Sequence, residues 1–560
     1  MISESARAAA GNFLHNETQF HLGFLPTEQS NPLTREMDKK FARSSAEGVH
    51  NLLEVDFNVL QMAEKIFASI QFQTFADTML STLKSGKKVV FSGCGATGRL
   101  SILLESMWKQ CCANSSACAP YADQVLSIMT GGDFALVRSV ESFEDFQIFG
   151  KRQVQELALG QGDMLVAITE GGETSSVLGT LFEALDRKCT VFLLFNNPAE
   201  LLAEKLERSR QAIRAPGVTV LDLCCGPMAL AGSTRMQATT SEQLVAGAAL
   251  ELAARALSGS KAEDFVLNFR SVLEQLTAAD AIQAMADFVD FESGVYRDHA
   301  LLTYFADEFM LDIFTDTTER TPTFMLPPFV KCDDKISPPP WTFVKNPLYS
   351  TAETWNRAML RKLRCLEWQR EDYAAMHAPE KLITAPPEID RDELLKFQIG
   401  NENTAARTVT GRDAAVMLTV CNRTTPEFIQ AFRQHSGAFA KTAHLSLGGN
   451  TPGDFHIPFS CPASPVDLME HMALKLVLNT VSTGIMAKLG RVSGNWMSFV
   501  NVSNKKLLDR GIRLVSELGG IPYEESCLAI FAAIEEVSRN TAPGETAPSI
   551  VQYVLNNLRR

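Results

Sequence analysis

The segment FSGCGATGRL, residues 91–100, limits the possible folds of this chain more than any other stretch. A short apolar run, residues 88–92, enters a glycine-rich loop, and a helical pattern follows from about residue 99. Glycine permits positive φ and close backbone approach, and free N–H groups at a helix start favour an anion. A tight turn capped by Thr97 explains the same residues without a ligand. The segment predicts a strand–loop–helix unit and leaves a phosphate site as one of two interpretations.

A dinucleotide is a weaker interpretation of the same loop. Gly93, Gly95 and Gly98 fit the spacing GxGxxG. No acidic residue ends a second strand about 20 residues later, and the lysine of a nucleotide-binding P-loop is absent.

The unit is repeated along the first half. Further strands are predicted at residues 125–129, 164–169, 190–195 and 218–223, and a long alanine-rich helix at 235–257. Alternating strands and helices indicate a parallel sheet covered on both faces. In such sheets ligands bind at the carboxyl ends of the strands.

A weaker alternation follows in the second half. Strands are predicted at residues 300–305, 414–420 and 443–447, a long apolar helix at 467–489, and helices at 507–518 and 524–537. Prolines exclude regular structure from residues 325–341, and the first 29 residues are polar and predicted to be irregular. We expect two copies of one α/β unit, the second degenerate, and a helical cap. The predicted boundaries are 1–46 for an N-terminal extension, 47–262 and 263–500 for the two units, and 501–560 for the cap.

Composition excludes several classes of protein. The formal net charge of -13 over 560 residues makes nucleic acid an improbable partner. The start of the chain lacks the features of a signal peptide, and no uncharged apolar run is long enough for a membrane span. The 12 cysteines form no CxxC pair and the 9 histidines do not cluster. We therefore expect a cytoplasmic protein with reduced thiols, no metal and no cofactor.

Two further loops carry polar side chains at predicted helix starts. Residues 168–179, ITEGGETSSVLG, offer hydroxyls to an anion, although Glu170 and Glu173 would repel a phosphate. Residues 231–244, AGSTRMQATTSEQL, combine Ser233 and Thr234 with Arg235, which suits an anion or a polyol. Simple helix capping explains both loops equally well.

A group of carboxylates lies between the first two loops in sequence. The segment SVESFEDF carries Glu141, Glu144 and Asp145. Neighbouring carboxylates can perturb each other's pKa and act as acid and base. A solvated helix face is the more common explanation of such a trio.

Taken in order, these motifs resemble a known family. The succession of GxGxTGRL, GGD, VESFED and GSTRMQA is similar to N-acetylmuramic acid 6-phosphate etherase. The later segment LKLVLNTVSTGIMAKLGRVSGNWMSFVNVSNKKLLDR is also similar to that enzyme. Two tandem sugar isomerase (SIS) units, with SNPLT early and LNTVSTG late, resemble the animal glucokinase regulatory protein. The resemblance covers roughly residues 30–540 and is poor over about 290–410.

The resemblance implies a sugar-phosphate site, for a phosphate of the fructose or amino-sugar class, with no cofactor. The residues that it places around the ligand are Gly95, Thr97, Gly98, Thr169, Ser175, Ser233 and Thr234. Glu141 and Glu144 would hold sugar hydroxyls, and Glu144 would be the catalytic residue of an enzyme. Lys506 and Arg510 would approach the ligand from the other half of the chain, and a sugar kinase is the protein partner that the family suggests.

The sequence departs from the etherase pattern at positions that matter for catalysis. Met107 replaces a glutamate in the helix after the glycine loop, and Glu105 lies on another side of that helix. Met228 and Gln237 replace a glutamate and a lysine. Loss of an acid or base typically costs about 10²- to 10⁴-fold in rate. A phosphosugar-binding regulatory protein is therefore the main hypothesis, and an etherase-like lyase or a phosphosugar isomerase is the alternative.

The second unit has no glycine loop after its first strand. The predicted strand at 300–305 continues into Ala306, Asp307, Glu308 and Phe309. These residues cannot form a phosphate-binding loop, so the sequence predicts one ligand site per chain.

Overall fold

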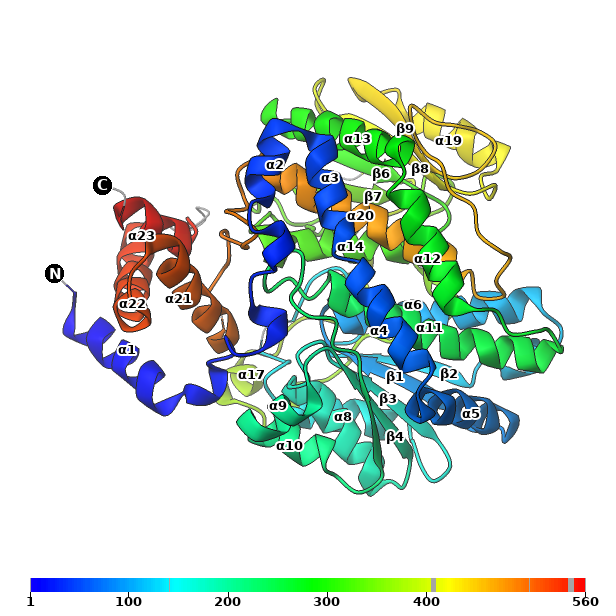
Figure 1. Ribbon diagram of the computed structural model, residues 1–560, viewed down its shortest axis with the longest axis horizontal. Helices are drawn as coiled ribbons and strands as arrows, with labels where there is room; N and C mark the ends of the chain where they lie inside the picture. The colour runs from blue at the N-terminus through cyan, green and yellow to red at the C-terminus, as the bar shows by residue number, and fades with distance from the viewer. Residues whose placement is uncertain (1, 141, 404–408, 503, 542–547, 559–560) are drawn as a thin grey trace.

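The computed structural model, which describes residues 2–140, 142–403, 409–502, 504–541 and 548–558, contains two five-stranded parallel sheets (Figure 1). The first has the strand order β2-β1-β3-β4-β5 and the second the order β10-β9-β8-β6-β7. Read in the opposite direction, the second sheet has the order β7-β6-β8-β9-β10, which is the order of the first sheet. In both sheets the first strand along the chain lies between the second and the third. The predicted fold, two tandem α/β units with a helical cap, is confirmed, whereas the domain boundaries stay predictions.

The strands of the first sheet are β1 (Val89–Gly93), β2 (Val125–Met129), β3 (Met164–Ile168), β4 (Thr190–Phe195) and β5 (Val218–Asp222). Those of the second are β6 (Leu302–Phe305), β7 (Thr342–Lys345), β8 (Ala414–Val420), β9 (Lys441–Leu447) and β10 (Phe455–Ile457). The sequence missed β7 and β10. Both are edge strands, and they are too short for a periodic pattern to show.

The first sheet is covered on both faces, as its apolar strands require. Val89 and Phe91 pack into one hydrophobic cluster and Val90, between them, into another. The helices of this unit are α5 (Ile70–Lys84), α6 (Ala96–Asn114), α7 (Gln147–Glu156), α8 (Ser175–Asp186), α9 (Ala199–Lys205), α10 (Glu207–Ile213) and α11 (Gln237–Ser258). Helices α5, α6 and α11 lie together, and α7, α8 and α10 form a separate group.

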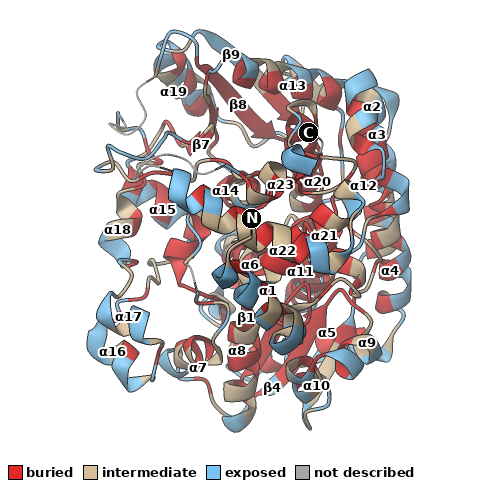
Figure 2. Cartoon of the chain, turned by 90° about the vertical axis from the view of Figure 1, so that its left-hand side faces the viewer, coloured by how far each residue is buried: buried red, intermediate tan, exposed pale blue. Residues whose placement is uncertain are grey.

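The second unit carries the helices α12 (Phe265–Leu276), α13 (Ala279–Arg297), α14 (Met310–Phe324), α15 (Thr351–Met359), α16 (Arg370–Ala375), α17 (Glu380–Thr384), α18 (Arg391–Leu395), α19 (Pro426–Ser436) and α20 (Leu468–Lys488). Helix α20 is buried along almost its whole length, whereas α16 and α17 are largely exposed (Figure 2). Preceding α5 in the chain are α2 (Met37–Arg43), α3 (Ser45–Glu54) and α4 (Phe57–Phe67), of which α2 and α3 pack on α20.

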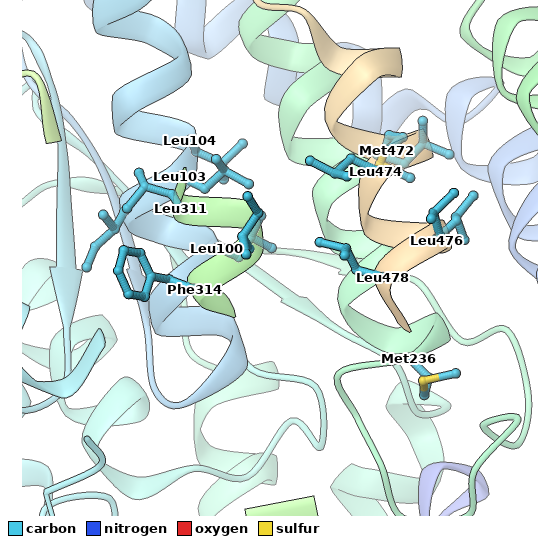
Figure 3. Packing of buried hydrophobic residues seen from close by; sticks show 14 of the residues in the cluster. Leu100, Leu103, Leu104, Met236, Leu311, Phe314, Met472, Leu474, Leu476 and Leu478 are labelled. Atoms are coloured by element: carbon cyan, nitrogen blue, oxygen red, sulfur yellow. The ribbon is translucent and has the colours of Figure 1, made fainter. Parts of the chain in front are cut away.

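The two units share one hydrophobic core. Leu100 and Leu103 of α6 lie beside Leu311 and Phe314 of α14, and α11 packs on α20 (Figure 3). Helix α14 follows β6 as α6 follows β1, and α20 closes its unit as α11 closes the first. Corresponding helices therefore meet at the interface, which puts the strand-end loops of each unit near a helix of the other.

The two ends of the chain form a separate helical bundle (Figure 1). Helix α1 (Glu4–Asn16) packs on α22 (Tyr523–Asn540), beside α21 (Lys505–Gly519) and α23 (Ile550–Leu558). Phe13 contacts Phe531, with ring centroids 6.3 Å apart. The prediction of an irregular start was wrong. Ala6, Ala10 and Phe13 are buried at helical spacing. Three residues are too few for a recognisable helical pattern in the sequence, and packing on α22 stabilises the helix.

Candidate functional site

The glycine loop after β1 is shaped by its own side chains. A Cβ atom on Gly93 would lie 2.3 Å from the backbone carbon of Thr97, so no larger residue fits. The Thr97 hydroxyl accepts from the Cys94 N–H at 3.0 Å and donates to the Cys94 carbonyl at 2.9 Å. Gly95 has a φ of 56°, and Gly98 packs on Met129. The buried Thr97 hydroxyl therefore fixes the loop conformation that presents the amides at the start of α6.

The loop after β3 contacts the carboxylate segment. The Thr169 hydroxyl donates to Thr174 at 3.0 Å, and Ser175 begins α8. The Ser176 N–H donates to the carbonyl of Glu144 at 3.0 Å. Glu144 therefore lies at this loop, in a turn before α7, and its contact with a ligand stays a prediction. Glu141, to which the same role was assigned, lies outside the described residues.

The third loop contains a buried hydroxyl that has no hydrogen-bond partner in the described part of the chain. Ser233 is 3% exposed, and its Oγ is unpaired. The Thr234 hydroxyl donates to Glu170 at 3.4 Å. Arg235 points away from the loop, to Asp316 at 2.8 Å and Thr483 at 2.8 Å in the second unit. The expectation that Arg235 assists an anion was wrong, because its charge belongs to the unit interface.

The two late cations lie at these loops, where carboxylates already bind them. Lys506 Nζ lies 2.9 Å from Glu173 Oε1, and Arg208 holds the other oxygen of that carboxylate. Arg510 binds Glu28 through two nitrogens, at 2.6 and 3.0 Å. The Arg510 side chain also lies against the third loop, since a Cβ on Gly232 would be 2.7 Å from its Nε.

Three acidic groups of the site have displaced pKa values, and in Glu170 and Glu173 the displacement is large. Burial raises the pKa of Glu170 to about 7, and burial also raises that of Glu144. Burial would raise the pKa of Glu173 as well, but Lys506 and Arg208 outweigh it and hold the value at about 2. Near neutral pH the site thus contains one ionised carboxylate on Lys506 and, in Glu170, one carboxyl group that titrates close to pH 7.

Sequence reasoning missed three contributors. Glu319 of α14 pairs with Arg99 at the glycine loop, and its charge raises the pKa of Glu170 further. Asn504 donates to Glu144 Oε1 at 2.9 Å, and Glu28 comes from the N-terminal segment. No local motif marks these residues. The signal that could have found Glu319 is the duplication, because α14 corresponds to α6 and faces the other unit's loops.

Within the described ranges, no three or more His, Cys, Asp or Glu side chains form a group able to hold a metal ion. Among the helices of the same ranges, none combines the length and apolar character needed to cross a membrane.

Two copies of a parallel sheet of order 2-1-3-4-5, with polar loops at the carboxyl ends of its strands, define a tandem SIS-type α/β protein. The family description "Glucokinase regulatory protein N-terminal SIS domain" matches residues 72–185. The N-acetylmuramic acid 6-phosphate etherase of Salmonella agona (strain SL483) is 32% identical over 230 residues, which are 40% of this chain and 68% of that enzyme. The chain belongs to the N-acetylmuramic acid 6-phosphate etherase family.

Two further matches share less sequence identity with the chain. N-acetylmuramic acid 6-phosphate etherase 1 of Bacillus licheniformis is 26% identical over 226 residues, 40% of this chain and 67% of that enzyme. Tagatose-6-phosphate ketose/aldose isomerase from Escherichia coli superposes with a TM-score of 0.43 and 10% identity, over 80% of this chain and 93% of that one.

Proposed function

We propose that the chain binds a sugar phosphate, of the fructose or amino-sugar class, at the three loops of the first sheet. The observation that carries the proposal is the unpaired Ser233 hydroxyl, 3% exposed in a loop that contacts Arg510. A buried polar group without a partner costs about 1–3 kcal/mol, and a ligand that supplies the hydrogen bond removes that cost. The etherase relatives, whose name includes a sugar 6-phosphate, support the same ligand class.

The ligand's two ends would meet different groups. Lys506 would exchange the Glu173 carboxylate for a phosphate oxygen, since both are anions of similar hydrogen-bonding capacity. Glu144 and Glu170 would accept hydrogen bonds from sugar hydroxyls. Thr97, Gly95 and Gly98 would act through the loop that they shape.

We propose a regulatory role as the main function. Lys506 and Arg510 lie on α21, which packs with α22 and α23 in the bundle formed by the chain ends. A ligand that binds these residues and the first unit together would favour one arrangement of the bundle, provided its affinity differs between arrangements. A protein partner, of which a sugar kinase is the family example, would then distinguish ligand-bound from free protein.

A lyase is the second candidate, and a specific observation favours it. Glu144 and Glu170 are two carboxyl groups in one site whose pKa values are raised by burial, in Glu170 to about 7. A pair of this kind can supply an acid and a base near neutral pH. The carboxylate that Met107 does not supply would come from Glu319 on the opposite unit.

Binding and turnover measured on the same proteins test both candidates. Calorimetry with fructose 6-phosphate and glucosamine 6-phosphate should show saturable binding that Ser233→Ala and Lys506→Ala weaken at least tenfold. Lys505→Ala is the matched control for the lysine, because Lys505 pairs with Glu17 at 2.9 Å, away from Glu173. If neither phosphate binds, the proposal fails.

The turnover assay uses N-acetylmuramic acid 6-phosphate. Turnover that is lost in both Glu144→Gln and Glu170→Gln would establish the lyase in place of the regulatory role. Sugar-phosphate binding without turnover would support the regulatory role.

A further inference from the structure

A cavity of about 80 Å³ lies at the carboxyl end of the second sheet. One water needs roughly 10–15 Å³ of such space, so the cavity has room for several waters or one small ligand. Its walls are the segment after β6, Arg423 after β8, the start of α20, the end of α15 and one face of α6. Apart from α15, these are the counterparts of elements at the first site, where the loops after β1 and β3 and the start of α11 meet α14.

The duplication therefore places a cavity where the second unit's own ligand would bind, outside the carboxyl ends of the strands and at the point where the strand order reverses. The charge at this cavity is opposite to that expected for an anion site, because carboxylates stand where the first unit has its glycine loop. Where β1 leads into Gly93, Cys94 and Gly95, β6 leads into Asp307 and Glu308. The cavity walls include four carboxylates, those of Asp307, Glu308, Asp312 and Asp467, against the two guanidinium groups of Arg357 and Arg423.

Most of the positive charge in the wall is already engaged. Arg423 lies 2.6 Å from Asp467 and also pairs with Glu470. Arg357 stacks on Tyr349, with its guanidinium carbon 4.1 Å from the ring centroid.

Asp307 and Glu308 form no ion pair with a described residue. Asp307 accepts one hydrogen bond, at 2.8 Å from Asn346, and no described residue forms a hydrogen bond or ion pair with the side chain of Glu308. Partial burial raises the pKa of Glu308, the neighbouring Asp307 charge raises it further, and the more weakly acting charges of Arg423 and Arg357 lower it. Two adjacent carboxylates that form no direct ion pair repel each other, and a ligand ammonium group would relieve that repulsion.

The rest of the wall suits a hydroxylated molecule. His471 donates through Nδ1 to Asp312, 2.9 Å away, which leaves Nε2 without a hydrogen bond to any described residue. Its ring centroid lies 4.7 Å from that of Phe309, which offers an apolar face. Gln110 of α6 also lines the cavity, and no hydrogen bond joins its amide to the described residues. Imidazole, amide and phenyl groups together fit a ligand with hydroxyls on one side and C–H groups on the other.

We propose that this cavity is a second binding site and that it takes a small hydroxylated primary amine, whose ammonium group lies between Asp307 and Glu308. The site is independent of the proposed sugar-phosphate site.

Glucosamine is the probe, and the Lys506→Ala chain is the protein, so that the first site does not contribute. Calorimetry and saturation-transfer NMR should show saturable binding of glucosamine. Glucose and N-acetylglucosamine, which lack the ammonium charge, should bind at least tenfold more weakly. Inorganic phosphate should not compete.

Glu308→Gln and Asp307→Asn should each weaken glucosamine binding at least tenfold. Glu308 is exposed, so its variant should fold normally, which circular dichroism and thermal melting check. Glu371→Gln, at another exposed position, is the control and should change nothing. The proposal is overturned if glucosamine does not bind, if glucose binds equally well, if phosphate displaces it, or if the Glu308→Gln protein binds it with unchanged affinity.

Discussion

Replacement of Glu173 by glutamine should strengthen the binding of sugar phosphates. In the free protein the Glu173 carboxylate occupies Lys506, 2.9 Å away, and its side chain is only 8% exposed. A phosphate must displace this carboxylate before it can use the lysine. Glutamine keeps the size of the side chain but removes the charge that competes with the ligand.

The structure sets the size of the effect. Two unit charges about 4 Å apart attract each other by about 4 kcal/mol at an effective dielectric constant of about 20. Desolvation offsets much of this, and hydrogen bonds to charged groups contribute about 1.5–3 kcal/mol net. Removal of the competitor should therefore raise the affinity for fructose 6-phosphate by about 10- to 100-fold.

Calorimetry at low ionic strength would measure the change, with a matched control. Glu17→Gln removes the carboxylate that pairs with Lys505, also at 2.9 Å, and should leave the affinity unchanged. The double variant Glu173→Gln, Lys506→Ala should show none of the gain, because the gain depends on the freed lysine. Unchanged or weaker binding by Glu173→Gln alone would refute the competition between carboxylate and phosphate.

Three other predictions concern the same loops. Ser233→Ala should leave the free protein as stable as the parent or up to about 1 kcal/mol more stable in urea denaturation, since the hydroxyl is buried without a partner, while the affinity for fructose 6-phosphate falls. The pKa of Glu170 is about 7 in the folded chain against the ordinary 4.5, so its contribution to stability is complete below about pH 4.5 and is lost as the pH rises through 7. The free energy of unfolding of Glu170→Gln should accordingly exceed that of the parent by on the order of 3 kcal/mol at pH 8 and by little at pH 5. An equal difference at both pH values would contradict this. Gly93→Ala should lower the free energy of unfolding by about 3 kcal/mol or more, because the added Cβ would lie 2.3 Å from the backbone of Thr97. Gly294→Ala, whose Cβ would have nothing within 4 Å, should not lower it.

Much of the fold follows from local pattern. The strand at 414–420 and the helices after the first two loops are found where periodicity, glycines and capping residues predict them. These signals depend on neighbours a few residues apart, so the sequence displays them directly. The three loops of the candidate site were found for the same reason, since each stands between a predicted strand and helix or at a helix start.

The pairing of charges was settled only by the tertiary structure. Arg235 follows two hydroxyl residues in its loop, a pattern typical of an anion site. Its side chain nevertheless points to Asp316, which is 81 residues away along the chain. Lys506 meets Glu173 across 333 residues, and Arg510 meets Glu28 across 482. No periodicity links such partners.

What the sequence determined by itself is the set of elements and the polar loops between them, because these depend on local backbone preferences and on the spacing of apolar residues. What the tertiary structure decided is which charges face one another, because this depends on how the second unit and the bundle of chain ends pack against the first. Glu319, Asn504 and Glu28 reach the site through that packing alone.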